Sequence, residues 1–323
     1  MATAAFKTPT LTDRNLESLT TTDYFGFTNS PTISSVALPL NFPLFLRTGQ
    51  AWNAAEFADE TRFVVNLTVE DKQELDDALE AFKSLCLDGN LVDRKSFPLR
   101  QLGRSLDEIA DEVHNGKGFC VLRGLEADRY CLEDGMIVFL GIQSYIAGRR
   151  MRQDEVGNML VHVTADPSNE NLSKHVRYST DSIRPILFHH DDRVIFCFTR
   201  LALVGNDFYP RPTSIPSITP RQREALDIMN SIAEKTRLEI SLQPGDIHFV
   251  NNLALLHRRD AFVDDNGHKR HLVRMHLRNE KLGWDIPDEL KQFWDQALDE
   301  ERDESWHIEP MPESFFPLKL GSH

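Results

Sequence analysis

The sequence predicts an α+β protein with a β-rich core wrapped by helices. Short apolar runs bounded by turn residues are typical of buried strands, and they occur at residues 118–125, 193–198 and 247–250. Longer segments with apolar residues at helical spacing flank these runs, and no linker separates two domains. We therefore expect an extended N-terminal arm over residues 1–45, a single domain over residues 46–300 and a tail over residues 301–323.

Several helix starts are visible in the sequence. Thr68 is a favourable N-cap for a helix in which Val69 shares the apolar stripe. Ser105 and Glu108 form a capping-box pattern, and Thr219 precedes a proline that suits the first helical position. Further helices are expected over residues 133–146 and 284–294.

Composition excludes several classes of function. The 323 residues include 36 basic and 50 acidic side chains, and the net charge of −14 disfavours nucleic acid and anionic membranes as partners. The four cysteines are scattered without zinc-type spacing, which is typical of reduced thiols. The N-terminus lacks the apolar core of a signal peptide, and no run approaches the roughly 18 apolar residues of a membrane span, so we expect a cytoplasmic protein.

The segment over residues 245–278 carries the most informative chemistry. An apolar run leads to His257, and Arg270 follows thirteen residues later at the start of an alternating segment that predicts a strand. An imidazole suits a metal ion and a guanidinium suits a carboxylate, so neighbouring strands could present both groups to one cavity. The alternative is a loop histidine beside a solvated basic strand.

A series of short motifs, taken in order, resembles one enzyme family. The motifs are Phe97-Pro98-Leu99, Leu102-Gly103, residues 116–119, residues 121–125, Gln153-Asp154, residues 192–195, Gly245-Asp246-Ile247, Asn251-Asn252-Leu253 and the pair His257 and Arg270. No single motif is diagnostic, but their order and spacing resemble the fungal branch of the taurine-dioxygenase-like (TauD/TfdA-type) oxygenases. The resemblance extends from about residue 40 to about residue 295.

This resemblance implies a double-stranded β-helix (jelly roll) that holds Fe(II) with two histidines and one carboxylate. Such enzymes use 2-oxoglutarate and O₂ to oxidise small organic metabolites, as in fungal secondary metabolism. His257 matches the distal histidine ligand of the family, and Arg270 matches the arginine that binds the far carboxylate of 2-oxoglutarate. Arg274, four residues later on the same strand face, supports that contact or meets an anionic substrate.

The sequence departs from the family at its first metal motif. The family places a histidine and a carboxylate in a His-x-Asp motif, shortly after a segment that resembles residues 174–182. Here that motif is absent, and residues 184–193 resemble a part of the family further downstream. We therefore expect an internal segment to be missing near residues 182–184, which leaves the family metal triad incomplete.

Residues 189–192 offer a replacement for the missing ligands. His189 and Asp191 are two residues apart, as are His190 and Asp192, and residues at this spacing share one face of a strand. With His257 they would complete a metal site. Against this, the following residues align with a family strand that carries no metal, where Asp192 would pair locally or cap a turn.

Three hypotheses remain open at this stage. The protein is a working iron and 2-oxoglutarate dioxygenase of a small molecule, or a non-catalytic relative that acts as a binding protein or partner subunit, or the product of a gene model that skips an exon. A hydrolase has little support, because no Gly-x-Ser-x-Gly motif is present. The substrate and the oligomeric state are left open.

Overall fold

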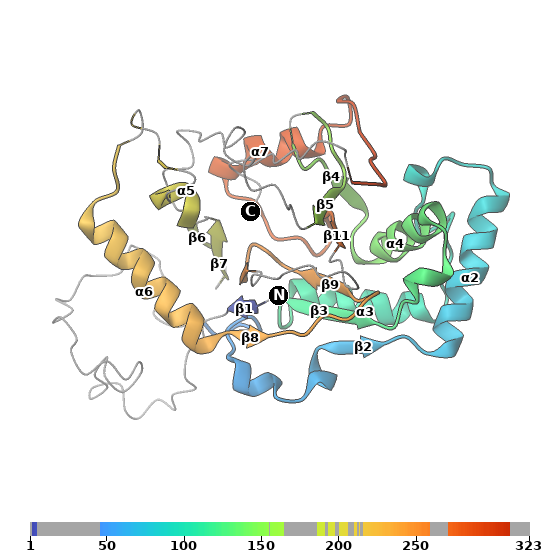
Figure 1. Cartoon of the computed structure of the whole chain (residues 1–323), viewed down its shortest axis with the longest axis horizontal. Helices are drawn as coiled ribbons and strands as arrows, with labels where there is room; N and C mark the ends of the chain where they lie inside the picture. Colours follow the sequence, from blue (N-terminus) through green and yellow to red (C-terminus); the bar gives the residue numbers. More distant parts are fainter. Residues whose placement is uncertain are drawn as a thin grey trace.

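The computed structural model describes residues 2–4, 46–154, 156–164, 186–190, 193–197, 200–205, 210–211, 213, 216–258 and 271–310 (Figure 1). Its strands are β1 (Ala2–Ala4), β2 (Val64–Asn66), β3 (Phe119–Arg123), β4 (Arg149–Met151), β5 (Val161–Thr164), β6 (Ile186–His190), β7 (Arg193–Cys197), β8 (Leu238–Glu239), β9 (Ile247–Val250), β10 (Leu256–Arg258), β11 (His271–Arg274) and β12 (His276–Arg278). Its α-helices are α2 (Val69–Ser84), α3 (Leu102–His114), α4 (Leu132–Ile146), α5 (Arg200–Val204), α6 (Pro220–Thr236) and α7 (Asp288–Leu298). Its 3-10 helices are η1 (Ala54–Phe57), η2 (Glu60–Arg62), η3 (Gly89–Leu91) and η4 (Ala127–Arg129).

A three-stranded sheet, β2-β3-β9, separates two hydrophobic clusters. Strand β3 is central, parallel to β2 and antiparallel to β9. Because successive side chains of a strand point to opposite faces, Cys120 and Leu122 enter one cluster while Phe119 and Val121 enter the other. All four are essentially inaccessible to solvent. Burial on both faces explains why β3 reads as a continuous apolar run.

The larger cluster packs helices α2, α3 and α4 against the sheet (Figure 1). Leu75 and Phe82 of α2 and Leu106 of α3 contribute fully buried side chains at helical spacing. Burying a side chain of this size stabilises the fold by about 1.5–3 kcal/mol relative to exposure. The predicted N-cap Thr68 is confirmed, whereas Val69, expected on the apolar stripe, is 77% exposed.

The smaller cluster is aromatic and lies on the other face of the sheet. The ring of Phe119 lies 5.1 Å from that of Trp52, 5.3 Å from Phe57 and 5.5 Å from Phe63, measured between centroids. The indole N–H of Trp52 donates to the carbonyl oxygen of Lys117 at 2.8 Å, so its polar atom is satisfied. Residues before β2 are thereby fixed to the start of β3.

Two antiparallel pairs join the middle of the chain to residues 271–278. Strand β5 pairs with β11, and β4 pairs with β12. The register places Val161 opposite Arg274 and Met151 opposite His276. Behind them, Trp284 and Leu290 of the α7 region are buried against Ile195. The basic strand predicted from the sequence is therefore paired and partly buried.

Helix α3 begins differently from the sequence prediction. Ser105 was expected as the N-cap, but the helix starts at Leu102, and Gln101 at the cap position makes no side-chain capping bond. Instead, the carboxylate of Glu74 on α2 accepts hydrogen bonds from the backbone N–H groups of Arg100, Gln101 and Leu102, the last at 2.9 Å. A carboxylate from a neighbouring helix supplies the cap because free N–H groups and the helix dipole both favour an anion there.

The predicted α+β class with flanking helices is confirmed. The strands that the structure describes form two- and three-stranded sheets, and these do not close into a barrel. Residues 182–184, where we expect the missing segment, lie outside the described residues. The division into arm, domain and tail stays a prediction. None of the described helices combines the length and the apolar character needed to cross a bilayer.

Candidate functional site

Strand β9 is positioned by the turn that precedes it. Gly245 has φ of +80°, and a Cβ atom there would lie 1.8 Å from the carbonyl oxygen of Leu125, so only glycine fits. The next residue, Asp246, has a side chain that is only 1% exposed and forms an ion pair with Arg123 of β3 at 3.0 Å. It also accepts the backbone N–H of Gln243 at 2.9 Å. This pair fixes the start of β9 against β3.

A tight turn after β9 leads the chain to β10. The backbone N–H of Asn251 donates to the carbonyl of Gly118 at 2.8 Å, and the carbonyl of Asn251 accepts from Ala254 and Leu255, each at 3.1 Å. Its side-chain oxygen accepts the N–H of Leu253 at 3.2 Å. Asn251 therefore holds this turn through its backbone and its side chain. Leu255 then anchors the chain in the aromatic cluster, two residues before His257.

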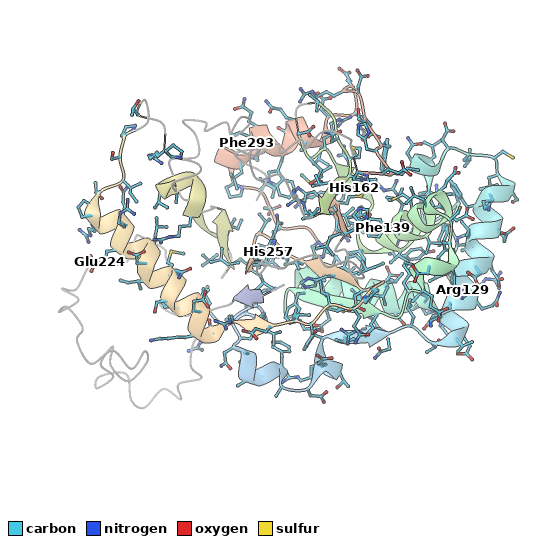
Figure 2. The ribbon with its side chains drawn as sticks, in the orientation of Figure 1. Arg129, Phe139, His162, Glu224, His257 and Phe293 are labelled. Atoms are coloured by element: carbon cyan, nitrogen blue, oxygen red, sulfur yellow. The ribbon has the colours of Figure 1, made fainter. Side chains whose placement is uncertain are left out.

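His257 lies on β10 (Figure 2). Its residue is exposed, yet the surrounding protein partly desolvates the ring and lowers its pKa, and the positive charge of Arg274 lowers that pKa further. Because a metal ligand must be a neutral imidazole, this environment suits the predicted role of His257.

Arg274 is the basic group that the structure brings to His257. It lies on β11, its Nε is buried and has no hydrogen-bond partner, and burial lowers its pKa. Within the described residues no carboxylate forms an ion pair with it. Arg270, the other predicted contact for 2-oxoglutarate, lies outside the described residues.

His248 is a third group at this place, and the sequence reasoning missed it. It lies on β9 opposite Val121, and both of its ring nitrogens are buried without a partner. Burial, followed by the effect of the neighbouring His257, lowers the pKa of His248 to about 3. The sequence did contain a signal for this residue, because His248 lies between apolar residues of a predicted strand in the same stretch as His257.

His114 and His162 differ from His248 because their ring nitrogens have partners. In His114, Nδ1 lies 2.7 Å from the carbonyl oxygen of Ala110. In His162, Nε2 lies 2.6 Å from the carbonyl oxygen of His307 and must donate, while Nδ1 lies 2.8 Å from Nε2 of His271. Unpaired ring nitrogens are thus a particular property of His248, and an unpaired buried polar group indicates a missing partner.

For the predicted replacement ligands, the structure describes only the backbone of the two histidines. The backbone of His189 pairs with Val194 and that of His190 with Arg193 in the β6-β7 hairpin, while Asp191 and Asp192 lie outside the described residues. In the described part of the chain, no group of three or more His, Cys, Asp or Glu side chains is arranged to hold a metal ion. The assignments of His189 and Asp191 therefore stay predictions.

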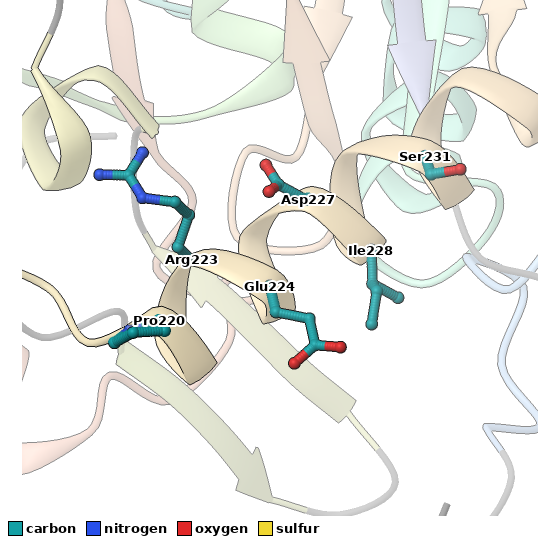
Figure 3. Close-up of a pocket in the computed structure, with 6 residues that line it drawn as sticks. All are labelled: Pro220, Arg223, Glu224, Asp227, Ile228 and Ser231. Atoms are coloured by element: carbon teal, nitrogen blue, oxygen red, sulfur yellow. The ribbon is translucent and has the colours of Figure 1, made fainter. Parts of the chain in front are cut away.

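A shallow pocket lies elsewhere, along one face of helix α6 (Figure 3). Its lining residues are Pro220, Arg223, Glu224, Asp227, Ile228 and Ser231. All belong to one helix, and Figure 2 places Glu224 at the edge of the molecule, away from His257. Because its lining side chains all come from one helix, this pocket does not bring together polar groups from different elements, as ligand sites usually do.

Residues 159–276 match the family described as taurine catabolism dioxygenase TauD, TfdA family. This segment is similar to the TauD/TfdA family. The matched range extends from just before β5 to the first residue of β12, and it includes His248, His257 and Arg274. The family predicted from the sequence motifs is confirmed.

Two relatives extend the similarity over most of the chain. A taurine hydroxylase-like protein, SAT17 of the fungus Stachybotrys chartarum, is 28% identical over 344 residues, covering 83% of this chain and 89% of the relative. The FR-33289 synthase of Streptomyces rubellomurinus is 21% identical over 319 residues, covering 75% and 93%. The alignment with SAT17 is longer than the 323 residues of the whole chain, so some residues of SAT17 have no counterpart in this chain.

Among solved structures, the non-heme iron oxygenase OrfP in complex with Fe is similar to this chain. The identity is 14% and the TM-score is 0.45, over 67% of this chain and 94% of OrfP.

Proposed function

We propose that this protein is an Fe(II)- and 2-oxoglutarate-dependent dioxygenase that oxidises a small organic metabolite with O₂. In this proposal Arg270 binds the far carboxylate of 2-oxoglutarate, and Arg274 supports it from β11. The observation that carries the proposal is the Nε of Arg274, which is buried and has no hydrogen-bond partner, together with the effect of Arg274 on the pKa of His257. Within the described residues no carboxylate pairs with this cation, and a bound carboxylate would offset the cost of its partial burial.

The electrostatics of this place favour an acidic ligand. The charged groups that shift the pKa of His257 and of His248 are all cationic, and burial alone lowers the pKa of Arg274. The chain as a whole carries a net charge of −14, so a locally positive environment is a departure from its general surface. A carboxylate would be attracted to these residues and held by a charge-assisted hydrogen bond.

The described residues do not complete a set of ligands for iron. His257 supplies one imidazole, whereas an iron site of this family type needs two histidines and a carboxylate and leaves positions open for the keto acid and O₂. The missing donors would have to come from side chains that the structure does not describe, for which those of His189 and Asp191 are our candidates. We therefore derive no reaction step through the metal.

The second candidate is a catalytically impaired member of the family that binds its ligand without oxidising a substrate. The absence of the His-x-Asp motif favours it, as does an alignment with SAT17 that is longer than the chain. An exon-skipped product would have the same features. Sequencing of transcripts distinguishes these two, because a longer transcript would carry a Phe-His-x-Asp segment between Ser182 and Arg184.

Binding of the keto acid tests the first part of the proposal. Arg270→Leu removes a bidentate contact, so we expect its affinity for 2-oxoglutarate by calorimetry to fall by about two orders of magnitude. Arg302→Leu, which removes an exposed arginine near the C-terminus, is the matched control and should bind as the parent does. Unchanged affinity in Arg270→Leu would remove this assignment, and weakening in Arg274→Leu alone would transfer the role to Arg274.

Metal analysis separates the two candidate functions. The parent and the variants His189→Ala, Asp191→Ala and His257→Ala are loaded with Fe(II) anaerobically, and bound iron and conversion of 2-oxoglutarate to succinate are measured. Near-stoichiometric iron that each variant loses supports a dioxygenase with replacement ligands. Weak iron binding with little turnover supports the impaired relative, because a single imidazole does not hold a labile divalent ion against water.

A further inference from the structure

A pair of histidines outside the candidate site joins strands β5 and β11. The Nδ1 of His162 on β5 lies 2.8 Å from the Nε2 of His271 on β11. The ring centroids are 5.1 Å apart, and the ring planes make an angle of 37°. A neutral imidazole is the commonest metal ligand in proteins. Two imidazoles that converge from neighbouring strands therefore form a candidate chelate.

The strand register places this pair on the opposite face of β11 from Arg274. His162 lies directly opposite Val273, and opposed residues of an antiparallel pair share a face. His271, two residues before Val273, lies on that face too, so the two histidines are diagonal neighbours. Arg274 alternates with Val273 and lies opposite Val161, so it points to the other face. A cation held by the histidines therefore does not share a face with this guanidinium.

Hydrogen bonding holds His162 in the tautomer that a metal ligand needs. Its Nε2 lies 2.6 Å from the carbonyl oxygen of His307, which only accepts, so Nε2 carries the hydrogen and Nδ1 carries the lone pair. Metal-binding histidines almost always donate their other ring N–H in this way, which fixes the ring and raises its basicity. The bond to His307 thus prepares His162 as a ligand before a metal ion arrives.

His271 supplies the second lone pair by a change of tautomer. Without a metal ion, its Nε2 donates to the Nδ1 of His162. Transfer of that hydrogen to its own Nδ1 frees Nε2 and leaves the net charge unchanged. The residue is exposed, so water accepts the new N–H. Burial of the ring, and then His162, lower the pKa of His271, which keeps the imidazole neutral at physiological pH.

The spacing of the two nitrogens suits a tetrahedral ion after a small movement. Zinc–nitrogen bonds of about 2.0–2.1 Å at a tetrahedral angle place two ligand nitrogens about 3.3 Å apart. From 2.8 Å the rings must separate by about 0.5 Å, and rotation of the exposed His271 side chain supplies this. Within the described residues no third His, Cys, Asp or Glu side chain joins the pair, so water completes the coordination.

We propose that His162 and His271 form a two-histidine site for a borderline-soft divalent cation, of which Zn²⁺ is the best match, and that the bound ion fastens β5 to β11. Nδ1 of His162 and Nε2 of His271 are the protein ligands. This site is separate from the iron proposed at His257 and does not rest on the proposed function. Because the two strands meet only in the folded chain, the cation stabilises the fold.

Calorimetric titration of the metal-free full chain with Zn²⁺ tests this inference. The background is His257→Ala, so that zinc at the candidate iron site does not contribute. We expect His162→Gln and His271→Gln each to weaken zinc binding by at least the roughly 10–100-fold that loss of an outer-shell partner costs. His114→Gln is the matched control, because its Nδ1 is already bonded to the carbonyl of Ala110, and it should bind as its background does.

The thermal readout is the rise in Tm at saturating zinc, which both histidine variants should lose and His114→Gln should keep. Binding and stabilisation that follow this pattern support the inference. Absence of zinc binding, or binding that either variant leaves unchanged, overturns it and leaves the pair as a hydrogen bond alone.

Folding of each variant is checked by circular dichroism. If His257→Ala does not fold, the same comparison is made in the parent. If His162→Gln does not fold, His271→Gln decides the outcome, because it leaves the bond between His162 and His307 in place. The iron and 2-oxoglutarate measurements are made without zinc, so failure of the proposed function and failure of this inference are separate results.

Discussion

The substitution Asp246→Asn tests whether the ion pair before β9 positions the candidate site. The side chain of Asp246 is 1% exposed and that of Arg123 is 14% exposed. Three contacts join them, from Nε of Arg123 at 3.1 and 3.2 Å and from Nη2 at 3.0 Å. The substitution keeps the shape of the side chain and removes its charge.

The magnitude follows from burial. Removing one partner of a buried ion pair costs about 3–5 kcal/mol, because the other charge is left without compensation. Arg123 keeps Glu60 and the carbonyl of Ser241 as partners, and asparagine retains one acceptor, so we expect a loss of about 2–4 kcal/mol. For a chain of this size that corresponds to a fall in Tm of roughly 3–6 °C.

Glu60→Gln is the internal control for this prediction. It removes the other carboxylate that contacts Arg123, but the side chain of Glu60 is 58% exposed, so solvent screens the pair and we expect a cost below about 1 kcal/mol. Urea unfolding measures both variants, and calorimetry measures their affinity for 2-oxoglutarate. Equal costs for the two substitutions would refute the reasoning, as would Asp246→Asn with wild-type stability and affinity.

Three further predictions follow from individual contacts. Glu74→Ala removes the acceptor for three backbone N–H groups at the start of α3 and should cost about 1–3 kcal/mol by urea unfolding, whereas Glu74→Gln should cost less; equal costs would contradict a charge-assisted cap. Gly245→Ala places a Cβ against the carbonyl of Leu125 at a positive φ, so we expect a loss of about 2 kcal/mol or more and weaker 2-oxoglutarate binding; a neutral result would show that the turn tolerates a side chain. Burial lowers the pKa of His114, so the unfolded chain binds a proton at this site more readily than the folded chain. The free energy of unfolding should therefore fall as the pH drops below about 6.5, by at most about 1.4 kcal/mol per pH unit. Between about pH 7.5 and 5, the Tm of His114→Gln should fall less steeply than that of the parent, and parallel curves would refute this contribution.

Local features of the fold could be predicted because they depend on residues close in sequence. Thr219 caps α6 through its contact with Gln222, which lies three residues away, and Asn251 holds its turn through residues up to four positions away. The same reasoning failed at Ser105, because the cap of α3 comes from Glu74, on a different helix. A capping pattern predicts a helix start only when no stronger partner arrives from elsewhere.

The candidate site likewise combines features that the sequence predicts with features that only the fold reveals. His257 and Arg274 were predicted by type and spacing to serve one site, but the desolvation that lowers the pKa of His257 was not. His248 was missed because its meaning depends on burial: in the sequence it is one polar residue in a strand, and in the fold it has two buried ring nitrogens without partners. In the unfolded chain water hydrogen-bonds to such a polar group, so the lack of a protein partner costs free energy only after folding has buried the group.

The sequence by itself determined the periodicity of the helices and strands and the order of the motifs that resemble the TauD/TfdA family, because these are properties of residue order. Only the tertiary structure decided that Asp246 is buried against Arg123, that Glu74 caps α3, and that the ring nitrogens of His248 and the Nε of Arg274 are buried without partners. The physical reason is that hydrogen bonding and electrostatics act through space and strengthen as water is excluded, and sequence separation does not encode that exclusion.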